Sequence, residues 1–131
     1  MDMSCDKKEI FVADGDMREC DRIAALLEGC GCSVTKAHSG AQALATLSGG
    51  GVVLAILDAP LEGKSGIEIL KELRRSCDEC EMPWIPVIIM SDGGKEMERN
   101  ARMANADVFF FKPLVRITLL EAVRQLLHRA Q

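Results

Sequence analysis

The most constraining feature of this sequence is a set of five short apolar runs that alternate with longer amphipathic segments. The runs cover residues 9–13, 33–37, 52–57, 86–90 and 108–111. Most are apolar throughout rather than at every second position, which is typical of strands buried on both faces. Strands that alternate with helices pair in parallel through right-handed crossovers. We therefore predict an α/β fold of (βα)5 type: a doubly wound, five-stranded parallel sheet of order 2-1-3-4-5 in a three-layer α/β/α arrangement.

The segments between these runs carry helix signals. Asp16 is placed to cap a first helix that ends near Gly29, and Ser39 followed by Gln42 predicts a capping box for a second. Ser65 caps a third helix, residues 96–104 form a mostly polar fourth, and a fifth closes the chain. The side chains expected to face the sheet are Met17, Ile23, Leu26, Leu27, Ile67, Leu70, Leu73, Met97, Met103, Ile117, Leu120, Val123, Leu126 and Leu127.

Length and composition limit the remaining possibilities. The 131 residues suit one domain, so we expect a single domain over residues 1–131. The net charge of −4, with basic residues spread along the chain, argues against direct nucleic-acid binding. No apolar run approaches the roughly 18 residues of a membrane span, and the polar N-terminus is unlike a secretory signal. We expect a cytoplasmic protein without a membrane segment.

Six cysteines and two histidines require an interpretation. Cys30 and Cys32 form one close pair, and Cys77 and Cys80 form another, which together could be imagined as a zinc site. The predicted fold puts the pairs at the ends of different elements, so we expect reduced thiols instead. His38 and His128 have no acidic or cysteine partner at ligand spacing, and we interpret both as surface residues.

Polar residues follow four of the five apolar runs. The first run leads into Asp14, Gly15 and Asp16; Asp58 ends the third; Ser91 and Asp92 follow the fourth; and Lys112 and Pro113 follow the fifth. The ends of parallel strands meet at one edge of a sheet, so these groups should face one another.

Such a set suits phosphoryl transfer to Asp58. A carboxylate can attack an activated phosphorus, and neighbouring carboxylates can hold Mg²⁺. A hydroxyl and an ammonium can then bind the phosphoryl oxygens. We expect an acidic bowl with Asp58 at its floor, open to solvent, and with the Lys112 ammonium within reach.

At this point the chain resembles the receiver domain of two-component response regulators, of the flavodoxin-like type. Four pieces carry the resemblance, and together they cover almost all of the chain: FVADGD (11–16), LAILDAPLEGKSG (54–66), VIIMSD (87–92) and FFFKPL (109–114). Their order and spacing fit the family, including the interval from Asp58 to Gly66.

The resemblance implies a role for each matching residue. Asp58 is implied as the phosphoacceptor, and the metal ligands are implied as Asp14, Asp58 and the backbone carbonyl of Pro60. Ser91 is implied as the hydroxyl that follows the phosphoryl group. The remaining assignments are Phe109 as the aromatic switch, Lys112 as the invariant lysine, and a cis bond between Lys112 and Pro113. From the residues alone, Phe109 is equally well explained as plain core.

Three positions depart from the family pattern. Gly15 replaces the second carboxylate of the metal site, which should weaken Mg²⁺ binding. Asp16 is an alternative ligand one position on, although its cap role competes. Asp92 stands where the family prefers a very small residue, and it either repels phosphate or supplies the carboxylate that Gly15 lacks. Glu62 replaces a common proline, which we interpret as a loop variation.

Three functions are therefore compared. The first is a phosphorylatable receiver, not an enzyme, that takes its phosphoryl group from a sensor histidine kinase or a phosphotransfer protein. It would signal through the fourth helix, fifth strand and fifth helix, which bind a partner or form a homodimer. The second is a pseudo-receiver that works as a phosphorylation-independent interaction module. The third is a dehalogenase-type phosphatase, which the sequence disfavours because Pro60 occupies the position of that class's second aspartate.

Overall fold

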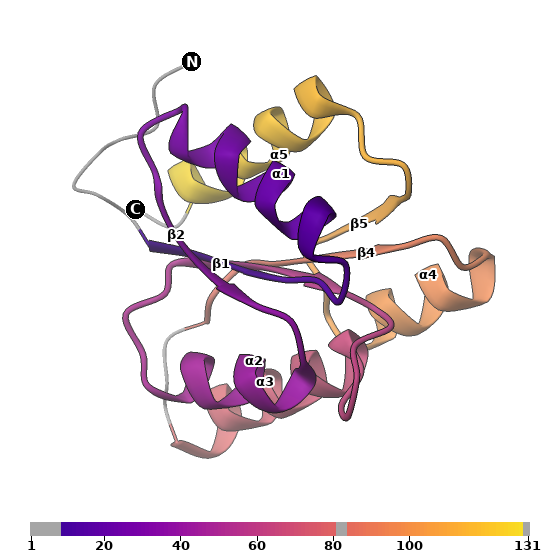
Figure 1. Cartoon of the computed structure of the whole chain (residues 1–131). Helices are drawn as coiled ribbons and strands as arrows, with labels where there is room; N and C mark the ends of the chain where they lie inside the picture. The colour runs from indigo at the N-terminus through magenta and orange to yellow at the C-terminus, as the bar shows by residue number, and fades with distance from the viewer. Residues whose placement is uncertain (1–8, 81–83, 130–131) are drawn as a thin grey trace.

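The computed structural model describes residues 9–80 and 84–129, which form ten alternating elements (Figure 1). The strands are β1 (Glu9–Ala13), β2 (Ser33–Ala37), β3 (Leu54–Asp58), β4 (Val87–Ser91) and β5 (Val108–Phe111). The helices are α1 (Met17–Glu28), α2 (Gly40–Ser48), α3 (Gly66–Cys80), α4 (Lys95–Met103) and α5 (Arg116–Arg129). All strand pairs are parallel, in the order β2-β1-β3-β4-β5. The predicted fold class and strand order are confirmed.

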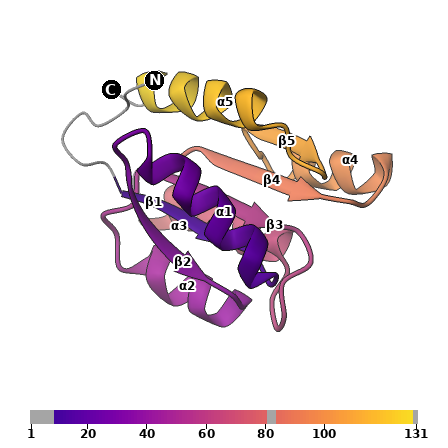
Figure 2. The same cartoon turned by 45° about the horizontal axis from the view of Figure 1, so that its top comes forward.

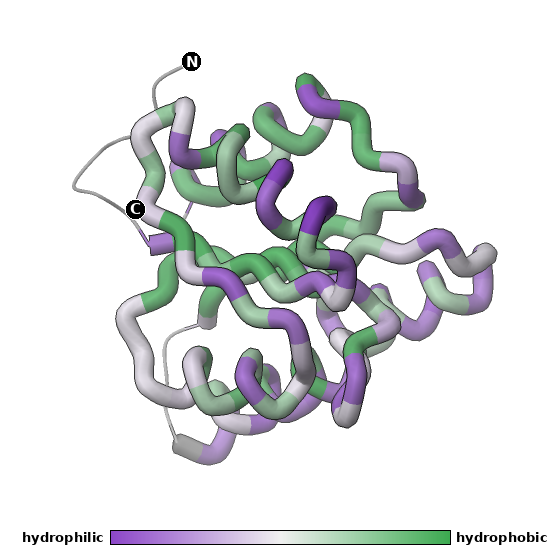
Figure 3. Tube along the Cα trace, in the orientation of Figure 1, coloured by the Kyte–Doolittle hydropathy of each residue, from purple (hydrophilic) through white to green (hydrophobic). Residues whose placement is uncertain are grey.

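The helices cover both faces of the sheet and complete the predicted three layers. On one face α1 and α5 pack over a core that includes Ile23 and Val123. On the other face α2, α3 and α4 pack over a core that includes Leu47 and Leu70. Figures 1 and 2 show these two groups of helices on opposite sides of the strands, and Figure 3 shows the central strands as the most continuous apolar part of the trace. This double burial explains why β3 and β4 are apolar along nearly their whole length.

The predicted helix starts are confirmed in their main features. The Asp16 carboxylate accepts hydrogen bonds from the backbone N–H groups of the first turn of α1. The Ser39 and Ser65 hydroxyls accept from N–H groups in the first turns of α2 and α3. The capping box is wrong in one detail, because the Gln42 amide oxygen accepts from the N–H of His38 and not of Ser39. The start of α2 is nonetheless fixed by two hydrogen bonds, one to the Ser39 hydroxyl and one to the Gln42 side chain.

Some predicted boundaries and core positions are wrong. The third and fourth strands begin at Leu54 and Val87 and end at Asp58 and Ser91, one or two residues later at the start and one at the end than predicted. Three side chains expected to face the sheet are instead exposed: Met17 (62%), Met103 (76%) and Ile117 (77%). Met17 is the first residue of α1, Ile117 is the second residue of α5, and Met103 is the last residue of α4. Helix ends that reach past the sheet leave such residues in solvent despite an apolar pattern.

Candidate functional site

The register of the sheet brings the predicted polar residues to one edge. Ala13 pairs with Leu57, Asp58 with Met90, and Ser91 with Phe111, so the strands end nearly level. The next residue after β1 is Asp14 and the next after β5 is Lys112. The Lys112 backbone N–H donates to the Ser91 carbonyl at 2.8 Å, which fixes the start of the loop that carries the lysine.

A lysine bridges two carboxylates at this edge. Lys112 Nζ lies 3.1 Å from Asp58 Oδ2 and 3.4 Å from Asp14 Oδ2. The expected reach of the ammonium is confirmed. The prediction that Asp58 is open to solvent is wrong, because Asp58 is only 4% exposed and Asp14 is fully buried. The Lys112 side chain itself occupies part of the space beside the two carboxylates.

Burial and the neighbouring charges shift the pKa values of Asp58 and Lys112. Burial, followed by hydrogen bonding and repulsion from Asp14, raises the pKa of Asp58 to about 7, against the opposing attraction of Lys112. Burial would lower the pKa of Lys112, but hydrogen bonding and attraction to Asp58 and Asp14 outweigh it and raise that pKa. A buried carboxyl whose pKa is raised in this way readily binds a proton or a cation.

One oxygen of the pair has no partner. Asp58 Oδ1 is buried and receives no hydrogen bond, which is costly unless another group satisfies it. The Ser91 hydroxyl, from a residue 2% exposed, accepts from the Gly93 N–H at 2.9 Å and keeps its own proton for donation. The site therefore offers one unsatisfied carboxylate oxygen with a hydroxyl on the next strand.

The loop after β3 is fixed by close backbone contacts. The Ala59 N–H donates to the Met90 carbonyl at 2.9 Å, and the Gly66 N–H donates to the Ala59 carbonyl at 2.8 Å. A Cβ on Gly66 would lie 2.4 Å from the Asp58 carbonyl oxygen. Only glycine allows this approach, which explains the interval from Asp58 to Gly66 in physical terms. Pro60 is exposed on the same loop, and its carbonyl as a metal ligand stays a prediction.

The two residues considered in place of the missing carboxylate have different surroundings. The cap of α1 uses only one oxygen of Asp16, because its Oδ1 accepts from the Arg18 and Glu19 N–H groups. The Asp16 side chain is exposed. Asp92 is exposed as well. Among residues 9–80 and 84–129, no three His, Cys, Asp or Glu side chains gather as a metal cluster. The neighbourhood of Gly15 is open, with no atom within 4 Å of a Cβ built there.

The oxygen ligands that remain fit Mg²⁺, although the site has fewer carboxylates than the family pattern. Magnesium needs only one or two carboxylates and completes its shell with water and phosphate oxygens. Asp14 and Asp58 supply those carboxylates, and the unpartnered Oδ1 of Asp58 is an oxygen that a cation would satisfy. Bound there, the ion would neutralise negative charge on an incoming phosphoryl group.

Phe109 is buried, at 7% exposure, and belongs to the core beneath α4. Its ring contacts Phe111 edge-on, with 5.0 Å between centroids. The interpretation as core is confirmed, and the switch role stays a prediction. The bond between Lys112 and Pro113 is cis, as the resemblance implied.

Sequence reasoning missed the position of His38. Its Nδ1 lies 3.1 Å from the backbone carbonyl oxygen of Asp14, and the residue is half-buried rather than a plain surface group. The signal was present, because His38 directly follows β2 just as Asp14 follows β1. His128 is exposed, as predicted.

The cysteines that the structure describes do not support zinc. Cys20, Cys30 and Cys32 lie with the core under α1 and α5, whereas Cys77 lies on α3 across the sheet. The side chains of Cys5 and Cys80 fall outside the described residues. Within the described parts of the chain, no helix is both long and apolar enough to cross a membrane.

The fold and the strand-edge residues together define a class: a doubly wound α/β domain of CheY-like architecture with a polar site at the carboxyl ends of its strands. Residues 10–124 match the family model of the response regulator receiver domain. The chain belongs to this family.

Relatives and solved structures agree with this assignment. The chain is 33% identical over 123 residues to the transcriptional regulatory protein CpxR of Klebsiella pneumoniae, covering 93% of this chain and 50% of that protein. It is 32% identical to ZraR of Klebsiella oxytoca, covering 92% of this chain but 27% of that protein. The chain thus spans half or less of these relatives. The receiver domain of the Francisella response regulator 1452 superimposes with a TM-score of 0.85 at 26% identity, covering 95% of this chain and 99% of that one.

A further solved structure shows a similar receiver domain together with its own partner protein. The receiver domain of Saccharomyces cerevisiae Ssk1, solved with the histidine phosphotransfer protein Ypd1, has a TM-score of 0.88 at 18% identity. It covers 95% of this chain and 92% of that one. At this identity the likeness shows the fold alone.

Proposed function

We propose that residues 1–131 act as one receiver domain that accepts a phosphoryl group on Asp58. A carboxylate oxygen of Asp58 attacks phosphorus, the new O–P bond forms as the N–P bond of a donor phosphohistidine breaks, and the electron pair returns to the imidazole. Mg²⁺ held by Asp14 and Asp58, with the Pro60 carbonyl, supplies charge neutralisation when bound. The observation that carries the proposal is the unpartnered Asp58 Oδ1 beside Lys112.

The other residues hold the product. Lys112, now bridging Asp58 and Asp14, can turn to one phosphoryl oxygen, and the Ser91 hydroxyl can donate to another. In this proposal Ser91 moves toward the added charge, and Phe109 and the α4–β5–α5 surface change population. That surface then binds a partner or forms a homodimer. The domain is a cytoplasmic signalling module rather than an enzyme, and its donor is a sensor histidine kinase or a phosphotransfer protein.

The assay is labelling by acetyl phosphate with Mg²⁺, followed by intact-protein mass spectrometry. We expect one phosphoryl group on the wild type and none on Asp58→Asn. Asp78→Asn, which changes an exposed carboxylate on α3 away from the site, is the matched control and should still be labelled. Persistent labelling of Asp58→Asn would remove Asp58 from the role.

A pseudo-receiver is the second candidate, and Gly15 and Asp92 are the observations that favour it. The two functions differ in Mg²⁺ binding, which backbone NMR can follow at the strand edge. Trp84 fluorescence is a poor reporter of Mg²⁺ binding. Trp84 lies before the first residue of β4, whereas the site lies at the last residue of that strand. Binding at millimolar Mg²⁺ supports the receiver, and a lack of binding supports the pseudo-receiver.

Gly15 offers a sharper test of the same point. The open space around it should accept an aspartate, so Gly15→Asp should tighten Mg²⁺ binding by about tenfold or more through the added ligand charge. Gly15→Asn has the same size without the charge and should change the affinity much less. Equal affinities in the two variants would show that position 15 does not face the ion.

A further inference from the structure

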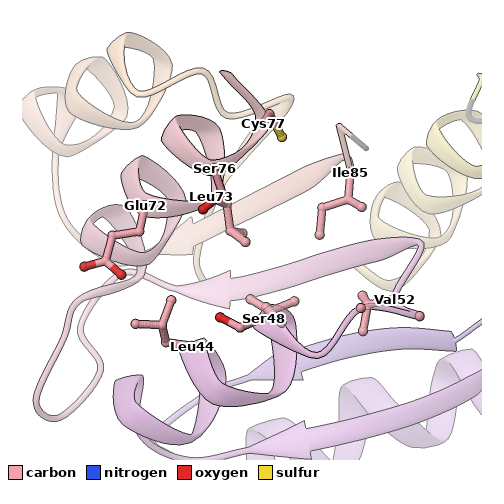
Figure 4. Close-up of a pocket in the computed structure, with 11 residues that line it drawn as sticks. Leu44, Ser48, Val52, Glu72, Leu73, Ser76, Cys77 and Ile85 are labelled. Atoms are coloured by element: carbon pink, nitrogen blue, oxygen red, sulfur yellow. The ribbon is translucent and has the colours of Figure 1, made fainter. Parts of the chain in front are cut away.

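A cavity lies at the opposite end of the sheet from Asp58. This partly open cavity of about 200 Å³ lies between α2, α3 and the segments that lead into β3 and β4 (Figure 4). Its apolar walls are Leu44, Leu47, Val52, Leu73 and Ile85. Val52 and Ile85 precede strands whose far ends carry Asp58 and Ser91, so this cavity is separate from the acceptor site.

The cavity also has polar lining residues on both α2 and α3, which together we call its rim. Ser48, Glu72, Ser76 and Cys77 contribute it. Glu72 is ion-paired with Lys64 of the loop before α3, which holds its carboxylate in place. Figure 4 shows Glu72 and Ser76 on α3 and Ser48 across from them on α2. The rim thus provides hydrogen-bond acceptors above an apolar floor, and the charge of Glu72 is balanced by Lys64.

Two glycines add bare backbone to the lining of the cavity. Gly50 and Gly51 line it, with φ of +78° and +86°, a region that favours glycine. A Cβ built on either would meet nothing within 4 Å. This part of the lining is therefore bare backbone next to open space.

We propose that this cavity binds a neutral aromatic molecule of about ten non-hydrogen atoms that carries one N–H or O–H group. An apolar cavity of about 150 Å³ is known to accept benzene, so about 200 Å³ accommodates a ring system of indole size. The rim oxygens of Ser48, Ser76 and Glu72 accept the single donor. The apolar walls disfavour a charged ligand of the same size, because its charge would lose water without gaining a partner.

Indole is the probe, titrated into ¹⁵N-labelled protein, with benzoate as the anionic comparison. We expect a dissociation constant of about 1 mM for indole and at least tenfold weaker binding for benzoate. Shifted amides should map to the walls and rim, while those of Asp58 and Ser91 stay unchanged. No shift at several millimolar indole, or shifts centred elsewhere, would overturn the proposal.

Two variants of Ser76 distinguish the effect of filling the cavity from the effect of removing a hydroxyl at its rim. Ser76→Phe places a ring in the cavity and should weaken indole binding by at least tenfold, whereas Ser76→Ala keeps the space and should stay within about fivefold of wild type. Wild-type affinity in Ser76→Phe would contradict the assigned site.

A chemical readout in the wild-type protein does not depend on any variant folding. Cys77 lines the cavity, whereas Cys30 lies across the sheet. Saturating indole should slow iodoacetamide alkylation of Cys77 several-fold, as followed by peptide mass spectrometry, and leave Cys30 unchanged. Equal rates at Cys77 with and without indole would count against the site.

Discussion

Replacing Asp58 with asparagine should stabilise the fold without metal, by an amount that depends on pH. Asp58 is nearly buried, and burial together with Asp14 raises the pKa of Asp58 to about 7 from an ordinary value of 3.8. The folded protein therefore holds this proton more tightly than the unfolded chain does. As pH rises from 4 to 7 the unfolded chain ionises first, so native stability is lost. A neutral amide of the same shape avoids that loss.

The structure sets the size of the effect. The difference between 3.8 and about 7, at about 1.4 kcal/mol per pH unit, corresponds to at most about 4 kcal/mol near pH 8. Local relaxation and water entry reduce such energies, so we expect a gain of about 2 kcal/mol near pH 8 and about 0.5 kcal/mol near pH 4.5.

Urea unfolding in EDTA at several pH values measures this difference. Asp78→Asn, an exposed carboxylate on α3, is the matched control and should change stability by less than about 0.5 kcal/mol at every pH. A gain for Asp58→Asn that is the same near pH 4.5 and pH 8, or a loss near pH 8, would refute the reasoning. Added Mg²⁺ should narrow the gap, because only the wild type has both carboxylates for it.

Three further predictions concern the scaffold. Gly66→Ala should lower the free energy of unfolding by about 2 kcal/mol in urea melts, because its Cβ meets the Asp58 carbonyl, whereas Gly49→Ala, at φ −75°, should be neutral or slightly stabilising. Burial raises the pKa of the Cys20 thiol from 9.0 to about 11, so peptide-level alkylation near pH 8 should be at least about 100-fold slower in the folded protein than in urea. Arg74→Met should cost about 3 kcal/mol in thermal or urea unfolding, and Arg75→Met, exposed on the same helix, less than about 0.5 kcal/mol.

The sequence could predict the strand edge because two simple rules combine there. Apolar runs mark buried strands, and parallel strands end at one edge, so Asp14, Asp58, Ser91 and Lys112 are brought together whatever the details of the loops. The same rules apply to His38 after β2, which was missed because histidine alone suggests no role in this chemistry.

Side-chain partners and exposure could not be predicted in this way. The Lys112 bridge, which leaves Asp58 almost covered, depends on distances of a few ångströms that no spacing rule fixes. The exposure of Met17, Met103 and Ile117 depends on how far each helix reaches past the sheet. Periodicity identifies the apolar face of a helix but not where its neighbour ends.

Arg74 shows most clearly what a sequence pattern hides. Next to Arg75 it looks like a second solvated charge, yet it is 5% exposed. Its guanidinium donates to the carbonyls of Ile85 and Asn105, and to the Asp107 carboxylate at 2.9 Å. These partners are up to 33 residues away in the chain.

The Arg74 network fixes the end of the molecule that carries the cavity, opposite the Asp58 edge. Asp107 accepts a second bond from the Val87 N–H at 2.8 Å, so one carboxylate holds α3 and the first residue of β4 together. The Trp84 ring stacks on the guanidinium at 3.7 Å, beside Ile85 of the cavity wall. Because α3 also begins against the Asp58 carbonyl, its two ends are fixed independently. Removing Arg74 should therefore disturb the cavity more than the carboxylate pair, and amide shifts in Arg74→Met that are larger around Asp58 than around Ile85 would contradict this account.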